Sequence, residues 1–311
     1  MTLQKMFELA DLRITDIWNE VDSQITSKLE YSKFGFSESD DTEFETTVQN
    51  FTGMGIADET GEKEAYKIDD VESAGFVVRR PKKFTKAFSV SEEALKYSRW
   101  PQISTATKAA MNSLNQRIDT DVASILRQGF TTNFLKGPNG EALFSATHTM
   151  KNGKTQSNTV GALPLTYDNL KTAVTLIDTQ SDDTGIRLLN GHRKLLIVSQ
   201  FNKHNAIQIL NSIGSPDTAN RVSNVWNTLQ GEIEMVVSNY IDDNGAAASK
   251  FNWFVIDKER AMDMVEIKWA WKPRMNTENI VNNGSKVYAA STMYKLIFRS
   301  FQWVVGSSSL S

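Results

Sequence analysis

Between Gly75 and Val90 the sequence reads GFVVRRPKKFTKAFSV, in which five cations surround a single proline. Its phenylalanines and valines recur with a period of two, which is typical of a β-strand, and Pro81 favours a sheet edge because it cannot donate a ladder hydrogen bond. With the glycine- and acid-rich stretch from Phe51 to about Asp69, this segment predicts a two-stranded ribbon. Arms of roughly 15–18 residues at about 3.3 Å each reach some 50 Å. So long a ribbon is marginal alone, and we expect another copy of the chain to cover it.

Two interpretations of the ribbon's charges stay open. In the first, the basic strand docks onto acidic residues of an adjacent copy and buries apolar side chains in the same contact. In the second, the acidic first strand pairs with the basic second strand within one soluble hairpin. The candidate contact residues of the first interpretation are Phe76, Val78, Arg79, Arg80, Lys82, Lys83 and Phe84, with Glu38, Asp40, Asp41, Glu43 and Glu45 as the acids of the neighbour.

A long helix is predicted directly after the ribbon. Ser91 is a good N-cap for a short helix that ends near Trp100, and the main helix then runs from about Ser104 to Gln128, with Gly129 as its stop. At 1.5 Å per residue this helix is roughly 37 Å long, which makes it a spine for the fold. Its predicted buried stripe is Met111, Leu114, Ile118, Val122 and Ile125.

The N-terminal residues predict another amphipathic helix of about six turns. Packing against its own domain and lying on a neighbouring subunit are equally open for this helix. An acidic link from Ser37 to Glu45 follows it. The apolar stripe of the helix consists of Leu3, Phe7, Ala10, Ile14, Ile17, Val21 and Ile25.

The second half of the chain predicts a mixed α+β domain without a repeating βαβ rhythm. Thr166 is expected to cap a helix, a second helix lies around 205–210, and the polar stretch 213–224 is expected to be an exposed loop. Predicted strands are Leu195–Val198, Ile233–Val237, Phe251–Ile256, Ile267–Trp271 and Met293–Val305.

Composition excludes several classes of function. The chain has 311 residues, a formal net charge of −3, three histidines and no cysteine. Disulfides, thiolate nucleophiles and cysteine-ligated zinc are therefore excluded, and the charge gives no overall basic footprint for tight nucleic-acid binding. No apolar run is long enough to span a bilayer. The first residues lack the apolar run of a secretory signal, so we expect synthesis in the cytoplasm, and we expect no cofactor, metal site or membrane partner.

Ser145 and His148 are the one pair that suggests catalysis. No G-x-S-x-G elbow surrounds the serine, and no predicted strand-to-helix turn would expose it. We predict no catalytic residues, and for His192 and His204 the favoured interpretation is a solvated or locally hydrogen-bonded side chain. A soluble hydrolase using Ser145 and His148 remains a remote alternative.

The order of the elements resembles that of the major capsid proteins of tailed bacteriophages, which have the Hong Kong 97 fold. The most specific likeness lies in Asn139–His148, which reads NGEALFSATH, followed by QSNT at 156–159. This stretch resembles the corresponding motif of the Mu-like major head subunit branch. Asn139 stands where that branch usually has aspartate, and Thr149 follows the histidine where proline is usual.

The resemblance implies a division of the chain into parts. Residues 1–48 would be an N-terminal arm, 49–90 an extended E-loop, 91–186 and 286–311 a P-domain with the spine helix, and 187–285 an A-domain. It also implies a major capsid protein that self-assembles into hexamers and pentamers of an icosahedral head around double-stranded DNA. Portal, scaffolding and decoration proteins would be further partners, and the location would be the virion capsid, assembled in the host cytoplasm. An encapsulin, a protein-loading shell of the same fold, is the alternative.

Overall fold

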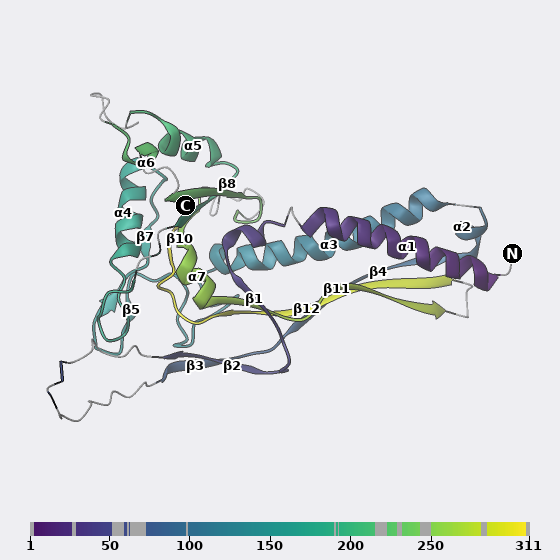
Figure 1. The fold of residues 1–311 in the computed structure, drawn as a ribbon, viewed down its shortest axis with the longest axis horizontal. Coiled ribbons are helices and arrows are strands. Elements are labelled where there is room, and N and C mark those ends of the chain that lie inside the picture. The colour runs from purple at the N-terminus through teal and green to yellow at the C-terminus, as the bar shows by residue number, and fades with distance from the viewer. Residues whose placement is uncertain are drawn as a thin grey trace.

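Two β-sheets joined by a long helix form the body of the protein (Figure 1). The structure is a computed structural model, and it describes residues 3–26, 29–51, 59–60, 62, 73–97, 99–189, 191, 193–214, 223–228, 232–242, 250–280 and 285–308. The predicted α+β class is confirmed.

The first sheet is long and carries two helices on one face. In register, Phe84 lies opposite Thr292 and Phe88 opposite Tyr288, and both phenylalanines turn toward the helices. Figure 1 shows the two helices running side by side along this face. The strand order is β1 (Ser37–Asp40), β11 (Val265–Ile280), β12 (Ser285–Phe298) and β4 (Lys82–Ser91), and the helices are α1 (Leu3–Thr26) and α3 (Trp100–Arg127).

The N-terminal helix packs on its own chain, which decides between the two interpretations left open by the sequence. Ile14 is fully buried among side chains of β4, α2 (Glu92–Lys96), α3 and β12, and Trp18 and Val21 pack against the middle of α3. Ser91 caps α2 as predicted, because its hydroxyl accepts the Ala94 amide.

The second sheet is covered on both faces. Leu196 and Val198 point toward α4 (Tyr167–Asp178) and α5 (Lys203–Asn211), whereas Leu195 and Ile197 point into the core around the end of α3. A strand buried on both faces reads as a continuous apolar run, as seen here. The strand order is β7 (Thr159–Gly161), β13 (Val304–Ser307), β10 (Trp253–Asp257), β8 (Lys194–Ser199) and β9 (Ile233–Ser238); α6 (Val225–Thr228) and α7 (Lys258–Met264) complete this body.

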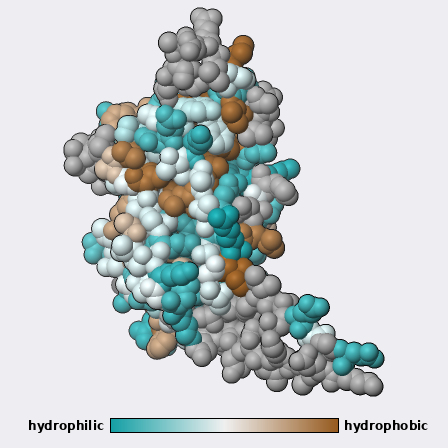
Figure 2. All heavy atoms as spheres, turned by 90° about the vertical axis from the view of Figure 1, so that its left-hand side faces the viewer, coloured by the Kyte–Doolittle hydropathy of each residue, from teal (hydrophilic) through white to brown (hydrophobic). Residues whose placement is uncertain are grey.

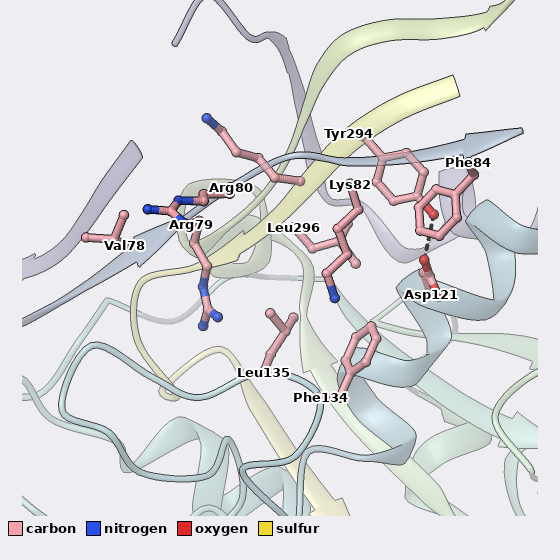
Figure 3. Close-up of a pocket in the computed structure, with 11 residues that line it drawn as sticks. Val78, Arg79, Arg80, Lys82, Phe84, Asp121, Phe134, Leu135, Tyr294 and Leu296 are labelled. Atoms are coloured by element: carbon pink, nitrogen blue, oxygen red, sulfur yellow. Dashed lines mark hydrogen bonds between the residues drawn. The ribbon is translucent and has the colours of Figure 1, made fainter. Parts of the chain in front are cut away.

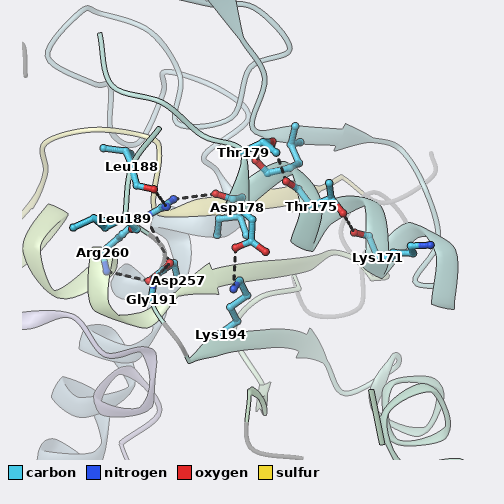
Figure 4. A network of polar contacts seen from close by, with 12 residues as sticks. Lys171, Thr175, Asp178, Thr179, Leu188, Leu189, Gly191, Lys194, Asp257 and Arg260 are labelled. Atoms are coloured by element: carbon cyan, nitrogen blue, oxygen red, sulfur yellow. Dashed lines mark hydrogen bonds and ion pairs between the residues drawn. The ribbon is translucent and has the colours of Figure 1, made fainter. Parts of the chain in front are cut away.

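A buried arginine ties the connections of this second body together (Figure 4). The Arg260 guanidinium donates to the carbonyl oxygens of Ile177, Leu189 and Gln302 at 2.9–3.2 Å and lies 3.6 Å from Asp257. The Asp257 carboxylate also accepts hydrogen bonds from two backbone amides, that of Arg260 and that of Gly191, the latter at 2.9 Å. Arg260 thus links the end of α4 and the loop that follows it to the turn between β12 and β13.

Three small elements complete the described fold. β2 (Thr46–Phe51) and β3 (Ser73–Arg79) form a separate two-stranded sheet, and β5 (His148–Thr149) pairs with β6 (Thr155–Gln156). The short 3-10 helix η1 (Tyr31–Phe34) links α1 to β1.

Two predicted strands are each split between two sheets. The segment 75–90 breaks at Arg80-Pro81, so that β3 pairs with β2 whereas β4 pairs with β12. The predicted strand 293–305 likewise divides into the end of β12 and the start of β13. The ribbon prediction was therefore wrong in its pairing: β2 begins at Thr46, before the acidic stretch, and most of 52–72 lies outside the described residues.

Smaller boundaries also differ. The spine helix begins at Trp100, four residues before the predicted start, because Pro101 is tolerated in the first turn of a helix. Of the predicted loop 213–224, residues 215–222 lie outside the described part of the chain.

Candidate intersubunit surface

The base of the β2–β3 ribbon is held by contacts with the rest of its own chain. Gly75 lies so close to the turn at 137–140 that a Cβ there would meet Asn139 Oδ1 at 2.5 Å, and its φ of 151° favours glycine. Asn50 Nδ2 lies 3.3 Å from Asp183 Oδ2, and the Arg79 guanidinium donates to the Lys136 carbonyl. These contacts fix where the ribbon leaves the body.

The outer face of β3 presents apolar side chains to solvent. Phe76 is 67% exposed and Val78 is 44% exposed, whereas Val77 lies opposite the buried Val48. Two of the predicted contact residues therefore have the exposure that a contact with another molecule requires. Phe84 differs, because its ring packs on Tyr294 and under the Arg117 guanidinium within the chain.

A cavity of about 350 Å³ opens beneath the corner between β3 and β4 (Figure 3). Arg79 and Lys82 extend from the corner toward Leu135 and Phe134, which rise from the loop after α3, while Val78 points away. At the back of the cavity, Asp121 accepts the Tyr294 hydroxyl at 2.8 Å and pairs with Arg117.

Most of the predicted acidic contact residues have partners within the chain. Asp41 and Lys295 form an ion pair of 2.8 Å whose side chains are 3% and 1% exposed, and Lys295 also donates to the Glu43 carbonyl. Glu45 pairs with Arg80, and Glu38 accepts the Trp269 indole N–H and lies 3.5 Å from Lys272. Asp40 and the Glu43 side chain are exposed. Lys83 lies over the Trp271 ring at 5.8 Å. A contact of these residues with another subunit stays a prediction.

A buried hydrogen-bond centre surrounds His148 and was missed by sequence reasoning. Its Nδ1 lies 2.8 Å from Glu141 Oε2, its Nε2 lies 3.0 Å from Asn158 Oδ1, and its ring stacks on Phe301 at 3.7 Å. Asn158 in turn donates to the Leu143 and Val304 carbonyls and so ties the NGEALFSATH stretch to β13. Glu141 and Asn158 both lie within the quoted motifs, but nothing in their spacing shows that they meet at one histidine.

The hydrolase alternative finds no support in this geometry. Both ring nitrogens of His148 are engaged by Glu141 and Asn158, while the Ser145 hydroxyl accepts the Thr147 amide. A serine nucleophile needs a base within hydrogen-bond reach of its hydroxyl. Within the described ranges there is also no group of three or more acidic or histidine side chains that could hold a metal ion, and no helix long and apolar enough to cross a membrane.

A second region of exposed apolar side chains lies on the other body. Viewed from the end that carries α4, the surface shows hydrophobic patches separated by hydrophilic side chains (Figure 2). Phe201 and Phe251 are both nearly half exposed, and the Lys250 ammonium lies over both rings. This body, like β3, has large apolar side chains that nothing within the described chain covers.

Comparison with known proteins identifies the family. The sequence profile of a family described as phage capsid protein matches residues 77–292, more than two thirds of the chain. This chain belongs to the phage capsid protein family. The predicted role as a phage major capsid protein is thereby confirmed, and the virion capsid is its location. A search of curated protein sequences gave no significant match.

Solved capsid structures share the fold of this phage capsid protein. The capsid of the cyanophage P-SCSP1u has a TM-score of 0.56 at 12% identity and covers 89% of this chain and 87% of its own. The capsid of Ralstonia phage GP4 gives 0.56 at 11% identity with the same coverage, and that of Myoviridae phage XM1 gives 0.53 at 11%, covering 91% and 92%. The predicted Hong Kong 97-type capsid fold is confirmed, whereas the Mu-like branch stays a prediction.

Proposed function

We propose that copies of this chain form hexamers and pentamers that close an icosahedral head around double-stranded DNA, with assembly in the host cytoplasm. Head-to-tail contacts between identical subunits generate closed rings. The observation that carries the proposal is the β2–β3 ribbon, which is fixed at its root and presents Phe76 and Val78 outward. Exposed apolar side chains on a fixed element mark a contact with another molecule.

The proposal includes the division of the chain into parts. Residues 1–48 form the N-terminal arm, 49–90 the E-loop, 91–186 and 286–311 the P-domain, and 187–285 the A-domain. The pairing of β11 with β12 along the long sheet supports placing 265–280 with the P-domain as well. Portal, scaffolding and decoration proteins are proposed as further partners of the shell.

Replacing 55–68 with a glycine–serine linker of equal length tests the role of the E-loop. We expect folded subunits that no longer sediment as shells, because many weak contacts made at once hold each subunit in place. Circular dichroism of the unassembled subunit is the control for folding. Shells of normal size and yield from this variant would refute the proposal.

The contents of purified wild-type particles separate the phage head from the encapsulin alternative. A head would protect DNA from nuclease, whereas a protein-loading shell would contain a cargo enzyme and no protected DNA. Electron microscopy of the same preparation tests icosahedral closure.

A further inference from the structure

The cavity beneath the β3–β4 corner has the size and the lining of a site for a small molecule. Its volume of about 350 Å³ lies within the range of pockets that bind small ligands. One side of it is apolar, because Phe134 and Leu135 are partly buried and Leu296 is only 7% exposed. Arg79 and Lys82 extend from the corner toward this apolar side (Figure 3). Ligand pockets combine in this way an apolar lining with a few polar groups that orient the ligand.

The charges that line the cavity are not balanced within the described part of the chain. Three charged residues of the lining have an oppositely charged partner, namely Asp121 with Arg117, Lys295 with Asp41 and Arg80 with Glu45. For Arg79 and Lys82, no carboxylate of the described residues lies within ion-pair distance. The cavity therefore carries an excess of positive charge that an anionic ligand would balance.

Arg79 also has a buried donor that is not used within the described chain. Its Nη2 donates to the Lys136 carbonyl, whereas its Nε–H is buried and meets no acceptor among the described residues. A buried donor without an acceptor is unfavourable, and burial also lowers the pKa of this guanidinium. A carboxylate fits the planar guanidinium, because its two oxygens can accept from two N–H groups at once.

The surroundings of Arg79 indicate what the carboxylate is attached to. Lys82 is exposed and can be hydrated, so a single negative charge is enough to balance the cavity. A small inorganic anion would leave the apolar side, formed by Phe134, Leu135 and Leu296, in contact with water. An apolar group joined to the carboxylate would cover this side.

We propose that this cavity binds a small organic carboxylate with an aromatic or aliphatic tail. Its carboxylate accepts from Arg79 Nε and pairs with Lys82. Its tail packs against Phe134, Leu135 and Leu296. The ligand thus contacts β3, β4 and the loop after α3, and it joins the base of the β2–β3 ribbon to the body. The site is independent of the proposed assembly, because all of its residues belong to one chain.

Isothermal titration of the full-length, unassembled subunit with phenylacetate tests the site. The comparison ligands are phenylacetamide, which lacks the charge, acetate, which lacks the ring, and phenyl phosphate, which replaces the carboxylate. We expect one phenylacetate to bind per chain, and phenylacetamide and acetate to bind about tenfold more weakly, because each loses one of the two kinds of contact. Equal affinity for phenylacetate and its amide would overturn the proposal. Tighter binding of phenyl phosphate would overturn the choice of a carboxylate.

Substitutions in the lining locate the bound ligand. Arg79→Gln should weaken phenylacetate binding by about tenfold, and Lys82→Gln, at an exposed side chain, should weaken it less. Leu135→Ala should weaken phenylacetate but not acetate, since it removes part of the apolar side alone. The matched control is Lys86→Gln, which makes the same charge change on β4 outside the cavity and should leave the affinity unchanged.

Circular dichroism of each variant is the control for folding. If Arg79→Gln does not fold, Lys82→Gln and Leu135→Ala test the site without it. No binding of phenylacetate to the wild-type subunit, or binding that neither of these two variants weakens, would overturn the proposal. The proposed shell assembly is measured separately by sedimentation, so it does not stand or fall with this site.

Discussion

Single carboxylates join distant parts of this capsid protein. Glu30, just after α1, accepts the Ser238 hydroxyl at 2.7 Å and the Asn239 amide at 3.0 Å at the end of β9. Asp119 in α3 accepts the Tyr31 amide at 3.0 Å. The two acids therefore hold the link η1 between the spine helix and the second sheet, at the expense of burying negative charge.

The protonation of Asp119 predicts how stability depends on pH. Burial, with a smaller contribution from Glu30, raises the pKa of Asp119 from 3.8 to about 6. The folded state therefore binds this proton more tightly than the unfolded state, and its contribution to stability falls as pH rises from about 4 through about 6. Asp119→Asn keeps an oxygen for the Tyr31 amide and removes the charge. We expect unassembled subunits to gain on the order of 1–2 kcal/mol at neutral pH and to lose part of their pH dependence.

Urea unfolding at a series of pH values measures this effect. Asp16→Asn, at an exposed acid on α1, is the control and should leave the profile unchanged. An Asp119→Asn profile that parallels the wild type would show that folding does not raise the pKa of Asp119.

At the scale of elements, the sequence predicted the helices more accurately than it predicted the pairing of the strands. α1, α3, α4 and α5 have their predicted positions because each carries its own apolar stripe and, in α4, a Thr166 cap. A strand's partner is not encoded locally: β1 pairs in parallel with β11, more than 220 residues away. The break at Pro81 was visible as a proline, but the assignment of β3 and β4 to different sheets was not. For the same reason Asp41 was predicted to contact a neighbouring subunit, whereas the structure pairs it with the buried Lys295 of its own chain.

The packing of α1 gives a prediction about this element. Ile14→Ala removes a fully buried side chain beside Val90, Ile103 and Tyr288, so we expect a loss of about 2–4 kcal/mol in the unfolding free energy. The loss should already be present in unassembled subunits, because the contact lies within one chain. Leu12→Ala is the control, since that side chain is 66% exposed and should change stability by less than about 0.5 kcal/mol. An effect of Ile14→Ala confined to assembled shells would contradict the packing described here.

At the scale of the whole molecule, one core joins both sheets. Val122 and Leu126 of α3, Phe254 of β10 and Trp269 of β11 belong to the same buried cluster. The long first sheet and the second sheet therefore share one continuous apolar contact. Cutting the chain between them would expose this cluster on both sides.

The shared core predicts one cooperative unfolding transition for the unassembled subunit. Because both sheets contribute to one core, they should unfold together. Fluorescence and far-ultraviolet circular dichroism should therefore give coincident urea curves. A first transition confined to residues 159–257 and 304–307, detected by hydrogen exchange, would show that the second sheet unfolds alone.

The shared core also determines which parts of the subunit can deform when copies form a curved shell. Close-packed interiors resist compression and transmit strain, so the region around α3 behaves as a rigid unit. Subunits of one shape that meet at unequal angles must accommodate the difference in angle at their contacts with one another. Any bending of the wall is thus left to the margins of the subunit, where side chains such as Phe76 and Phe201 are free to shift.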